Sequence, residues 1–424
     1  MSAEERFESM PRTVRCCIAG GGPAGMMLGL LLARAGVEVV VLEKHADFLR
    51  DFRGDTIHPS TLELMHELGL LEDFLRLPHQ KVQRLTGQVG DVPITIADFS
   101  HLPTRCKFIA FMPQWDFLNF LAAQAARYPT FHLRMQAEVT GVLEEAGRVV
   151  GVRATTPDGP AEIRAALVVA ADGRSSTVRE QAGLHPRELA APMDVLWFRL
   201  SRRPTDPEET TGRFDRGRIY IRINRGDHWQ CGYVIPKGAA ETVRRGGLES
   251  FRAEVATVMP FAADRVGELR DWEAVKLLSV QLNRLLQWYR PGLLCIGDAA
   301  HAMSPVGGVG INLAIQDAVA AANLLAEPLR GGGPTPDDLQ RVQRRRMLPT
   351  RVIQGVQVQV QRRVIMRVLA GAGPLKPALP LRIMARFPVL LRLPGRMIGL
   401  GVRPEHVKTS AMPPSVSGSP LPAR

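Results

Sequence analysis

The chain has 424 residues, of which 45% are hydrophobic and 23% are charged. This globular composition excludes a largely disordered chain and corresponds to two or three domains or one large one. The net charge of +12 arises from residues 331–424, which carry 16 Lys and Arg residues and three acids. Phe387 is the only aromatic residue there, so stacking platforms for bases are absent and we expect no nucleic-acid partner.

Cysteine content and the N-terminal residues indicate in which cellular compartment the protein is expected. The five cysteines show no CxxC spacing, and the histidines show no metal-ligand spacing, so we expect no disulfide framework and no metal site. The N-terminal residues include no apolar signal segment, and no run of about 18 apolar residues occurs. We therefore expect a cytoplasmic protein without a spanning helix.

The first organised segment predicts a strand, a glycine turn, a helix and a second strand. The apolar run VRCCIA at 14–19 leads into Gly20, Gly22 and Gly25, which fit GxGxxG, and then into MMLGLLLARAG and VEVVVLE. These glycines allow a tight turn, the approach of a pyrophosphate, and close packing of helix on strand. Glu43 ends the second strand, where a carboxylate can accept ribose hydroxyls. The pattern predicts a dinucleotide site, with FAD favoured over NAD; the alternative is a glycine turn that binds nothing.

Two further motifs follow strand-like runs. LVVA at 167–170 ends in Asp172 and a turn before the helical VREQAG, and LLCI at 293–296 ends in Asp298. Each carboxylate is thus expected at the carboxyl edge of a sheet, where open α/β sheets bind ligands. Glycines then precede a long helix of small residues, LAIQDAVAAANLLA; the alternative is a structural helix with a flexible entry loop. The glycines are Gly307, Gly308 and Gly310.

Together, the three motifs over about residues 13–330 resemble those of FAD-dependent monooxygenases of the p-hydroxybenzoate hydroxylase type. The resemblance implies that Asp172 serves both FAD and the nicotinamide donor and that Asp298 binds the ribityl chain. It implies an ADP-binding group of Gly20, Gly22, Ala24, Gly25 and Glu43, and an isoalloxazine-binding group of Pro305, Gly307, Gly308, Gly310, Ile311 and Asn312.

Three more positions match the family by place in the sequence. The resemblance implies that Arg53 contacts the flavin side of FAD, that Gln114 opens a helix near the cofactor, and that Val139 touches adenine. The alternatives are a solvated loop arginine, a plain helix cap and an ordinary core strand residue.

Between 186 and 287 the hydrophobic period changes to two. Alternation at 219–223 and 229–235 around a turn predicts a hairpin, and DVLWFRLS at 194–201 predicts another strand. The aromatic residues of these strands either line a pocket or pack the hairpin core; they are Phe198, Tyr220, Trp229 and Tyr233.

The expected fold class is α/β: a Rossmann-like FAD-binding domain with an inserted mixed β-sheet substrate domain and a helical C-terminal segment. The expected domains are a discontinuous FAD-binding domain (1–75, 105–185 and 288–330), a substrate domain (76–104 and 186–287), a helical C-terminal cap (331–408) and a disordered tail (409–424).

The basic C-terminal quarter has two interpretations. Residues 336–370 read as a helix whose arginines Arg341, Arg344, Arg345 and Arg346 lie on a mostly solvated face, and 375–402 mixes leucines with arginines between prolines. Such pieces could lie on an anionic membrane. We expect instead a cap whose leucines pack on the catalytic body, with weak vesicle binding at most.

The resemblance implies a single-component monooxygenase that uses NAD(P)H as co-substrate and O₂ to hydroxylate a phenol-like or quinol-like aromatic substrate, through a flavin hydroperoxide. The alternative is another FAD-fold oxidoreductase, such as a flavin halogenase or a prenyl-chain reductase. The halogenase pattern Trp-x-Trp-x-Ile-Pro is not found, and WQCGYVIP at 229–236 only echoes it.

Overall fold

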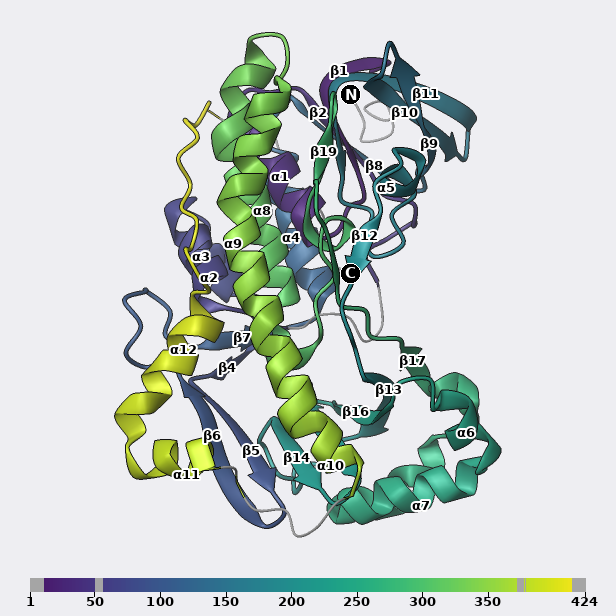
Figure 1. Ribbon diagram of the computed structural model, residues 1–424, viewed down its shortest axis with the longest axis vertical. Helices are drawn as coiled ribbons and strands as arrows, with labels where there is room; N and C mark the ends of the chain where they lie inside the picture. Colours follow the sequence, from purple (N-terminus) through teal and green to yellow (C-terminus); the bar gives the residue numbers. More distant parts are fainter. Residues whose placement is uncertain (1–10, 50–55, 372–376, 378, 414–424) are drawn as a thin grey trace.

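The computed structural model describes residues 11–49, 56–371, 377 and 379–413 of the protein, in two large sheets linked by long helices (Figure 1). The first sheet has eight strands, in the order β19-β20-β11-β1-β2-β8, with β10 and β9 continuing from β11. From β20 to β8 the neighbours run parallel, so the run VVVL of β2 is wholly buried. The strands are β1 (Thr13–Ala19), β2 (Val39–Leu42), β8 (Phe131–Arg134), β9 (Glu138–Glu145), β10 (Arg148–Thr156), β11 (Gly159–Ala170), β19 (Tyr289–Arg290) and β20 (Leu293–Cys295).

Three apolar helices lie beside this sheet, and α1 (Pro23–Arg34) contacts both of the others, α4 (Gln114–Ala125) and α8 (Gly310–Arg330). The shorter helices are α2 (Pro59–Glu67), α3 (Leu71–Leu75), which comes directly after α2, and α5 (Thr177–Gln181), which follows β11. Ser176 caps α5 by accepting a hydrogen bond from the Arg179 N–H at 3.0 Å. The strand–turn–helix order expected for all three motifs is confirmed.

The second sheet has seven strands, in the order β17-β13-β16-β15-β14-β5-β6. The predicted hairpin is present, with Ile219 opposite Val234. The parallel pairing of β14 with β5 joins segments about 120 residues apart to make one mixed sheet. The strands are β5 (Arg84–Val89), β6 (Val92–Asp98), β13 (Met193–Ser201), β14 (Thr211–Asp215), β15 (Arg218–Asn224), β16 (His228–Pro236) and β17 (Lys276–Leu278). The small sheets comprise β3 (Thr56–Ile57), β7 (Ile109–Phe111) and β4 (Gln80–Val82), and β12 (Pro186–Glu188) with β18 (Asn283–Leu285).

The two faces of the second sheet pack differently. Phe198, Tyr220 and Trp229 lie buried under α6 (Ala240–Arg245) and α7 (Leu248–Val258), so these aromatics pack the core rather than line a pocket. The opposite face carries Trp197 and Ile219 in a separate cluster. That cluster also contacts the loop before α8 through Val306.

A helical C-terminal segment connects the two sheets. It comprises α9 (Pro336–Val360), a π-helical turn (Gln361–Ile365) and α10 (Met366–Leu369), which reaches β15 (Figure 1). Then α11 (Leu379–Arg386) and α12 (Arg392–Gly399) lie outside β6. Residues 409–413, expected in a disordered tail, lie along α1, where the Met412 N–H donates to the Arg34 carbonyl at 2.8 Å. The expected α/β class, with an inserted mixed sheet and a helical C-terminal segment, is confirmed.

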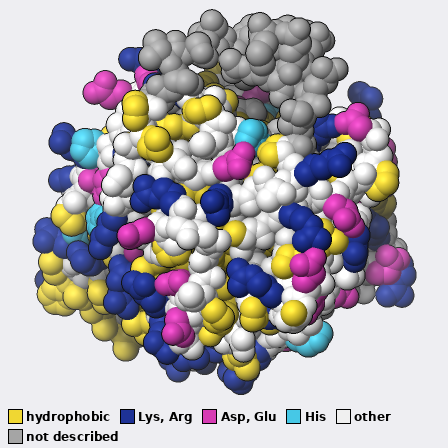
Figure 2. Space-filling model, turned by 90° about the horizontal axis from the view of Figure 1, so that it is seen from above, with side chains coloured by type: hydrophobic (Ala, Val, Ile, Leu, Met, Phe, Trp, Pro, Cys, Tyr) yellow, Lys and Arg dark blue, Asp and Glu magenta, His cyan; other side chains and the backbone are white. Residues whose placement is uncertain are grey.

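Surface charge and hydropathy complete the description. Acidic and basic side chains are interspersed over the centre of the face shown in Figure 2. In the part of the chain that the structure describes, one helical segment, Val306–Arg330, is long and apolar enough to cross a membrane, and 78% of its most apolar window is buried inside the protein. It is therefore the core helix α8 with its entry turn.

Candidate functional site

The turn after β1 places its three glycines in different environments. Gly20 has a φ of 103°, and a Cβ there would lie 2.4 Å from the carbonyl oxygen of Ala171. A Cβ on Gly25 would lie 2.0 Å from the carbonyl oxygen of Gly20. At Gly22, no atom of the described chain lies within 4 Å of such a Cβ. The first and third glycines are required by the protein's own packing, whereas the second faces a space that a pyrophosphate can enter.

The start of α1 and the end of β2 complete this corner. Gly22 is the N-cap of α1 and provides no side-chain cap, so the first N–H groups of the helix are available to an anion. The Glu43 carboxylate accepts hydrogen bonds from the Gly21 N–H at 2.9 Å and from the His45 N–H at 3.1 Å. Two backbone donors therefore hold this carboxylate beside the glycine turn, where the sequence placed a ribose ligand.

The Gly-Asp turn after β20 packs directly on α1. Gly297 has a φ of 58°, and a Cβ there would lie 3.2 Å from the Cβ atoms of both Ala24 and Ala314. Small side chains on α1 and α8 therefore let the two helices meet the turn closely. Asp298 follows at the exposed edge of this contact, with 34% of its side chain accessible.

Two arginines tie the Asp-Gly motif after β11 to this turn. Arg174 Nε donates to the Asp298 carboxylate at 3.1 Å. Arg179 is buried and donates to the carbonyls of Ala299, at 3.1 Å, and Arg174, at 2.7 Å. The two acidic motifs, joined by a pair of residues 124 positions apart, therefore form one unit.

Asp172 shows that this unit suits a ligand. One carboxylate oxygen accepts the Val178 N–H at 3.1 Å, whereas the other, Oδ1, is buried without a partner among the described residues. Burial raises the pKa of Asp172, although hydrogen bonds from the Ser176 side chain and the Val178 N–H oppose this. A buried acceptor without a protein donor requires one from a ligand or water.

The loop before α8 contains three of the expected isoalloxazine-binding residues. Pro305 precedes the short turn Val306–Gly308, in which Gly307 and Gly308 have φ values of 81° and 63°. A Cβ on Gly308 would lie 2.6 Å from Thr56 Oγ1, and that hydroxyl donates to the Gly308 carbonyl at 2.9 Å. The close approach of β3 therefore requires glycine at this position.

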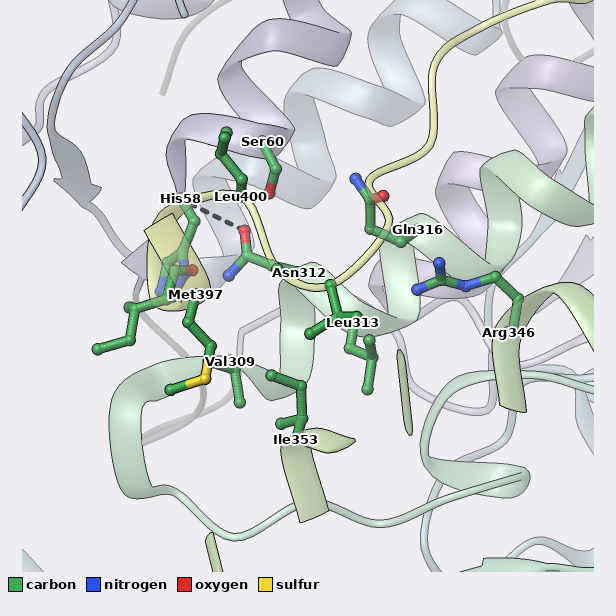
Figure 3. Close-up of a pocket in the computed structure, with 13 residues that line it drawn as sticks. His58, Ser60, Val309, Asn312, Leu313, Gln316, Arg346, Ile353, Met397 and Leu400 are labelled. Atoms are coloured by element: carbon green, nitrogen blue, oxygen red, sulfur yellow. Dashed lines mark hydrogen bonds between the residues drawn. The ribbon is translucent and has the colours of Figure 1, made fainter. Parts of the chain in front are cut away.

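Asn312 fastens the same loop to α2 (Figure 3). Its side-chain oxygen accepts the His58 N–H at 2.9 Å and the Thr61 hydroxyl at 2.8 Å, and its amide donates to the Thr56 carbonyl at 3.0 Å. The side chain is therefore committed to the protein. It leaves the first backbone N–H groups of α8, those of Gly310, Ile311 and Asn312, for a cofactor.

The remaining expected site residues are more widely spread. Gln114 is the first residue of α4, after Pro113 as N-cap. Val139 is buried in β9, opposite Ala154 of β10. Arg53 lies outside the described residues. No group of three or more His, Cys, Asp or Glu residues within the described ranges is placed to hold a metal ion.

Residues 13–355 match the protein family described as FAD binding domain. The chain belongs to this family. It is 33% identical over 384 residues to a 6-methylpretetramide 4-monooxygenase of Streptomyces rimosus, an alignment that covers 89% of this chain and 91% of the relative. It is 29% identical over 352 residues to a 12-dehydrotetracycline 5-monooxygenase/anhydrotetracycline 6-monooxygenase of the same species, covering 75% of this chain but 63% of that longer relative.

Solved structures agree on the fold. An anhydrotetracycline hydroxylase from Streptomyces rimosus superposes with a TM-score of 0.69 at 24% identity, covering 91% of this chain and 76% of that one. The p-nitrophenol 4-monooxygenase from Pseudomonas putida gives 0.68 at 21% identity, with coverages of 91% and 98%. The flavoprotein is therefore an oxidoreductase, a FAD-dependent monooxygenase.

Sequence reasoning missed a buried charge network beneath the flavoprotein's Gly-Asp turn. Asp317 of α8 accepts hydrogen bonds from His301 at 2.6 Å, from Arg346 at 2.9 Å and from the Gly297 N–H at 3.2 Å. Arg346 also lies 3.3 Å from Glu405. Although burial opposes ionisation, the charges of His301 and Arg346 lower the pKa of Asp317. The network holds the turn that carries Asp298 and ties the C-terminal residues to it.

This network corrects one expectation for α9. Arg346 was expected on a mostly solvated face with Arg341, Arg344 and Arg345, yet its side chain is 1% exposed. Helical periodicity turns Arg346 toward α8, where Asp317 compensates its charge. The sequence alone does not show which of the four arginines faces the interior, because the acid that lies opposite it belongs to a different helix.

Proposed function

We propose that this monooxygenase hydroxylates a phenol-like or quinol-like aromatic substrate, with NAD(P)H as the reductant and O₂ as the source of the inserted oxygen. The named substrates of relatives support an aromatic compound: 6-methylpretetramide, anhydrotetracycline and para-nitrophenol. The structural observation that carries the proposal is the joining of three distant motifs into one corner, through the contact of Ala24 with the Gly297 turn and the Arg174–Asp298 ion pair.

The residues of this corner fit FAD. The open space at Gly22 and the start of α1 would take the pyrophosphate, Glu43 the adenosine ribose, and Asp298 a ribityl hydroxyl. When bound, FAD would supply the redox chemistry, from hydride acceptance to oxygen activation. The protein's part is to bind, orient and exclude water. The roles of Arg53, Gln114 and Val139 stay proposals from the resemblance.

We place the substrate between the α8 entry loop and the inner face of the second sheet. Val306 of that loop packs against the cluster containing Trp197 and Ile219. An apolar surface there would shield the reacting atoms from water and favour a flat aromatic ring. This placement uses the domain boundaries proposed from the sequence, in which 76–104 and 186–287 form the substrate domain; strands from both ranges pair in the second sheet.

The halogenase alternative is disfavoured by Trp229. This residue, which begins the segment that echoes a halogenase pattern, is buried under the outer helices, and its Nε1 donates to Asp206 at 2.9 Å. It therefore lies on the opposite face of the sheet from Trp197 and Ile219. A cytoplasmic location is also proposed, supported by five buried cysteines without disulfides in the described chain.

The test is a screen of phenols and quinols on the FAD-loaded enzyme. We expect an aromatic substrate to accelerate NADH or NADPH oxidation, with matching O₂ uptake and one atom of ¹⁸O₂ in the product. Added halide should change neither rate nor product. Product without ¹⁸O, or halide-dependent turnover, would refute the proposal.

A further inference from the structure

Large hydrophobic side chains are exposed in one short stretch of the C-terminal segment. Within 379–393, six of them are exposed, from Ile383 and Leu390 at 43% to Leu393 at 76%. Along α11 they recur at i and i+4, which places Leu379 and Ile383 on one helix face. We define the 379–396 surface by these side chains and the arginines among them: Leu379, Ile383, Phe387, Val389, Leu390, Leu393, Arg382, Arg386, Arg392 and Arg396.

This surface corrects part of the expectation of a cap with buried leucines: Leu391 and Leu400 are buried, but the six side chains above are exposed. The helix α12 contacts the body through glycines instead: a Cβ on Gly395 would lie 2.0 Å from the carbonyl oxygen of Asp98, the last residue of β6, and one on Gly399 would lie 2.6 Å from the Leu102 side chain, in the loop after β6. The helix face that carries these two glycines therefore faces the protein, and Leu393 faces outward. Figure 1 shows α11 and α12 at the edge of the molecule, beyond β6.

Part of the surface forms a groove. Val389, Leu390 and Leu393 line it with Arg392 and Arg396, opposite the loop 101–103. Apolar and basic groups therefore lie side by side there.

Charge decides which partner fits this surface. Residues 379–404 include no acid, so a two-fold contact between copies would set arginines against arginines without a counter-charge. Protein interfaces are enriched in Tyr, Trp, Phe, Met and Arg; the stretch has arginines but no Trp or Tyr, and Phe387 is its one aromatic residue. An anionic bilayer instead offers phosphates to the arginines and hydrocarbon to the leucines.

We propose that the 379–396 surface docks the enzyme on anionic membranes, with its leucines at the headgroup boundary and its arginines on lipid phosphates. This role is independent of the reaction proposed above. α12, fixed on β6, presents Leu393 without any rearrangement of the fold, so docking needs no conformational change.

The test uses the full-length, FAD-loaded enzyme and sedimentation with vesicles. One set is phosphatidylcholine, and the other contains phosphatidylcholine with about one third phosphatidylglycerol. Because each basic residue near such a surface contributes about fivefold in partitioning, Arg392→Gln with Arg396→Gln should weaken binding to anionic vesicles about 25-fold. The matched control, Arg244→Gln with Arg245→Gln on the exposed turns of α6, removes the same charge elsewhere and should weaken binding less than threefold.

Two further measurements complete the test. Leu390→Ser with Leu393→Ser should also release the enzyme, and 1 M salt should abolish binding because it shortens the Debye length to about 3 Å. All variants change exposed side chains, and their urea unfolding midpoints should match wild type. Equal binding to neutral vesicles, no binding to either set, or dimerisation lost in the leucine variant would overturn the proposal.

Discussion

A matched pair of glycine substitutions separates cofactor binding from folding. Gly22 has φ −72° and ψ −177°, a conformation open to any residue, and faces empty space. Gly25 faces the carbonyl oxygen of Gly20 at a distance that no Cβ can tolerate. Gly22→Val should therefore fold as the wild type does and lose FAD, whereas Gly25→Ala should lose stability even without FAD.

The sizes follow from the contacts. Valine at position 22 would block the space before α1 and deprive the pyrophosphate of about two charge-assisted hydrogen bonds, each worth about 1.5–3 kcal/mol. A loss of about 3 kcal/mol corresponds to FAD binding on the order of 100-fold weaker. The cost to the apoprotein should be about 1 kcal/mol, the typical value for a changed N-cap. Gly25→Ala should cost about 1–3 kcal/mol, as overpacking does.

Fluorescence titration of the apoproteins with FAD, and their urea unfolding curves, give both quantities. If Gly22→Val binds FAD within about threefold of the wild type, the pyrophosphate does not lie at this turn. If apo Gly25→Ala is as stable as wild type, the close packing of α1 on the glycine turn is wrong.

Other predictions test the acidic motif, a buried histidine and the charge network. Asp298→Ala should weaken FAD binding tenfold to hundredfold, with under about 1 kcal/mol lost because its pair with Arg174 is partly exposed; an unchanged Kd would contradict this. Burial lowers the pKa of His58 to about 4, so the unfolded chain binds this proton first, and the free energy of unfolding should fall by about 2–3 kcal/mol between pH 7 and 4.5. In urea unfolding at both pH values, His58→Gln should not show this fall in the free energy of unfolding. The same pH dependence in the variant and the wild type would refute the role of His58. Asp317→Asn should cost about 3–5 kcal/mol in the same assay, against under about 1 for the exposed control Asp264→Asn; equal losses would exclude a structural role for the network.

What the sequence predicts well is local along the chain. The glycine turn is specified within six residues, and the structure shows the first and third glycines in contact with each other. The hairpin of β15 and β16 follows from its alternation, because each strand buries its two faces against different clusters. Such patterns are sufficient because the contacts that require them lie close by in the sequence.

Contacts between distant segments are not predictable in this way. The hydrogen bond from His58 to Asn312 joins residues 254 positions apart, and nothing in either segment names the other. The sequence singled out Asn312 as a flavin contact because of its place in the motif, but its side chain is committed to holding β3 and α2. Arg174 and Arg179 lie in the Asp-Gly motif that follows β11, and only the fold shows that they reach the turn that carries Asp298.

The C-terminal segment shows why an amphipathic pattern leaves its own orientation open. Leucines and arginines mixed between prolines fit a cap that buries the leucines and equally a surface that presents them. The deciding residues are Gly395, where a Cβ would lie 2.0 Å from the Asp98 carbonyl oxygen at the end of β6, and Gly399, where a Cβ would lie 2.6 Å from the Leu102 side chain. The helix face that carries these two glycines is buried against the body. The side chain of Leu393, which is 76% exposed, therefore points away from the body. The glycine spacing, rather than the leucines, was therefore the signal in the sequence for which side of this helix faces the protein.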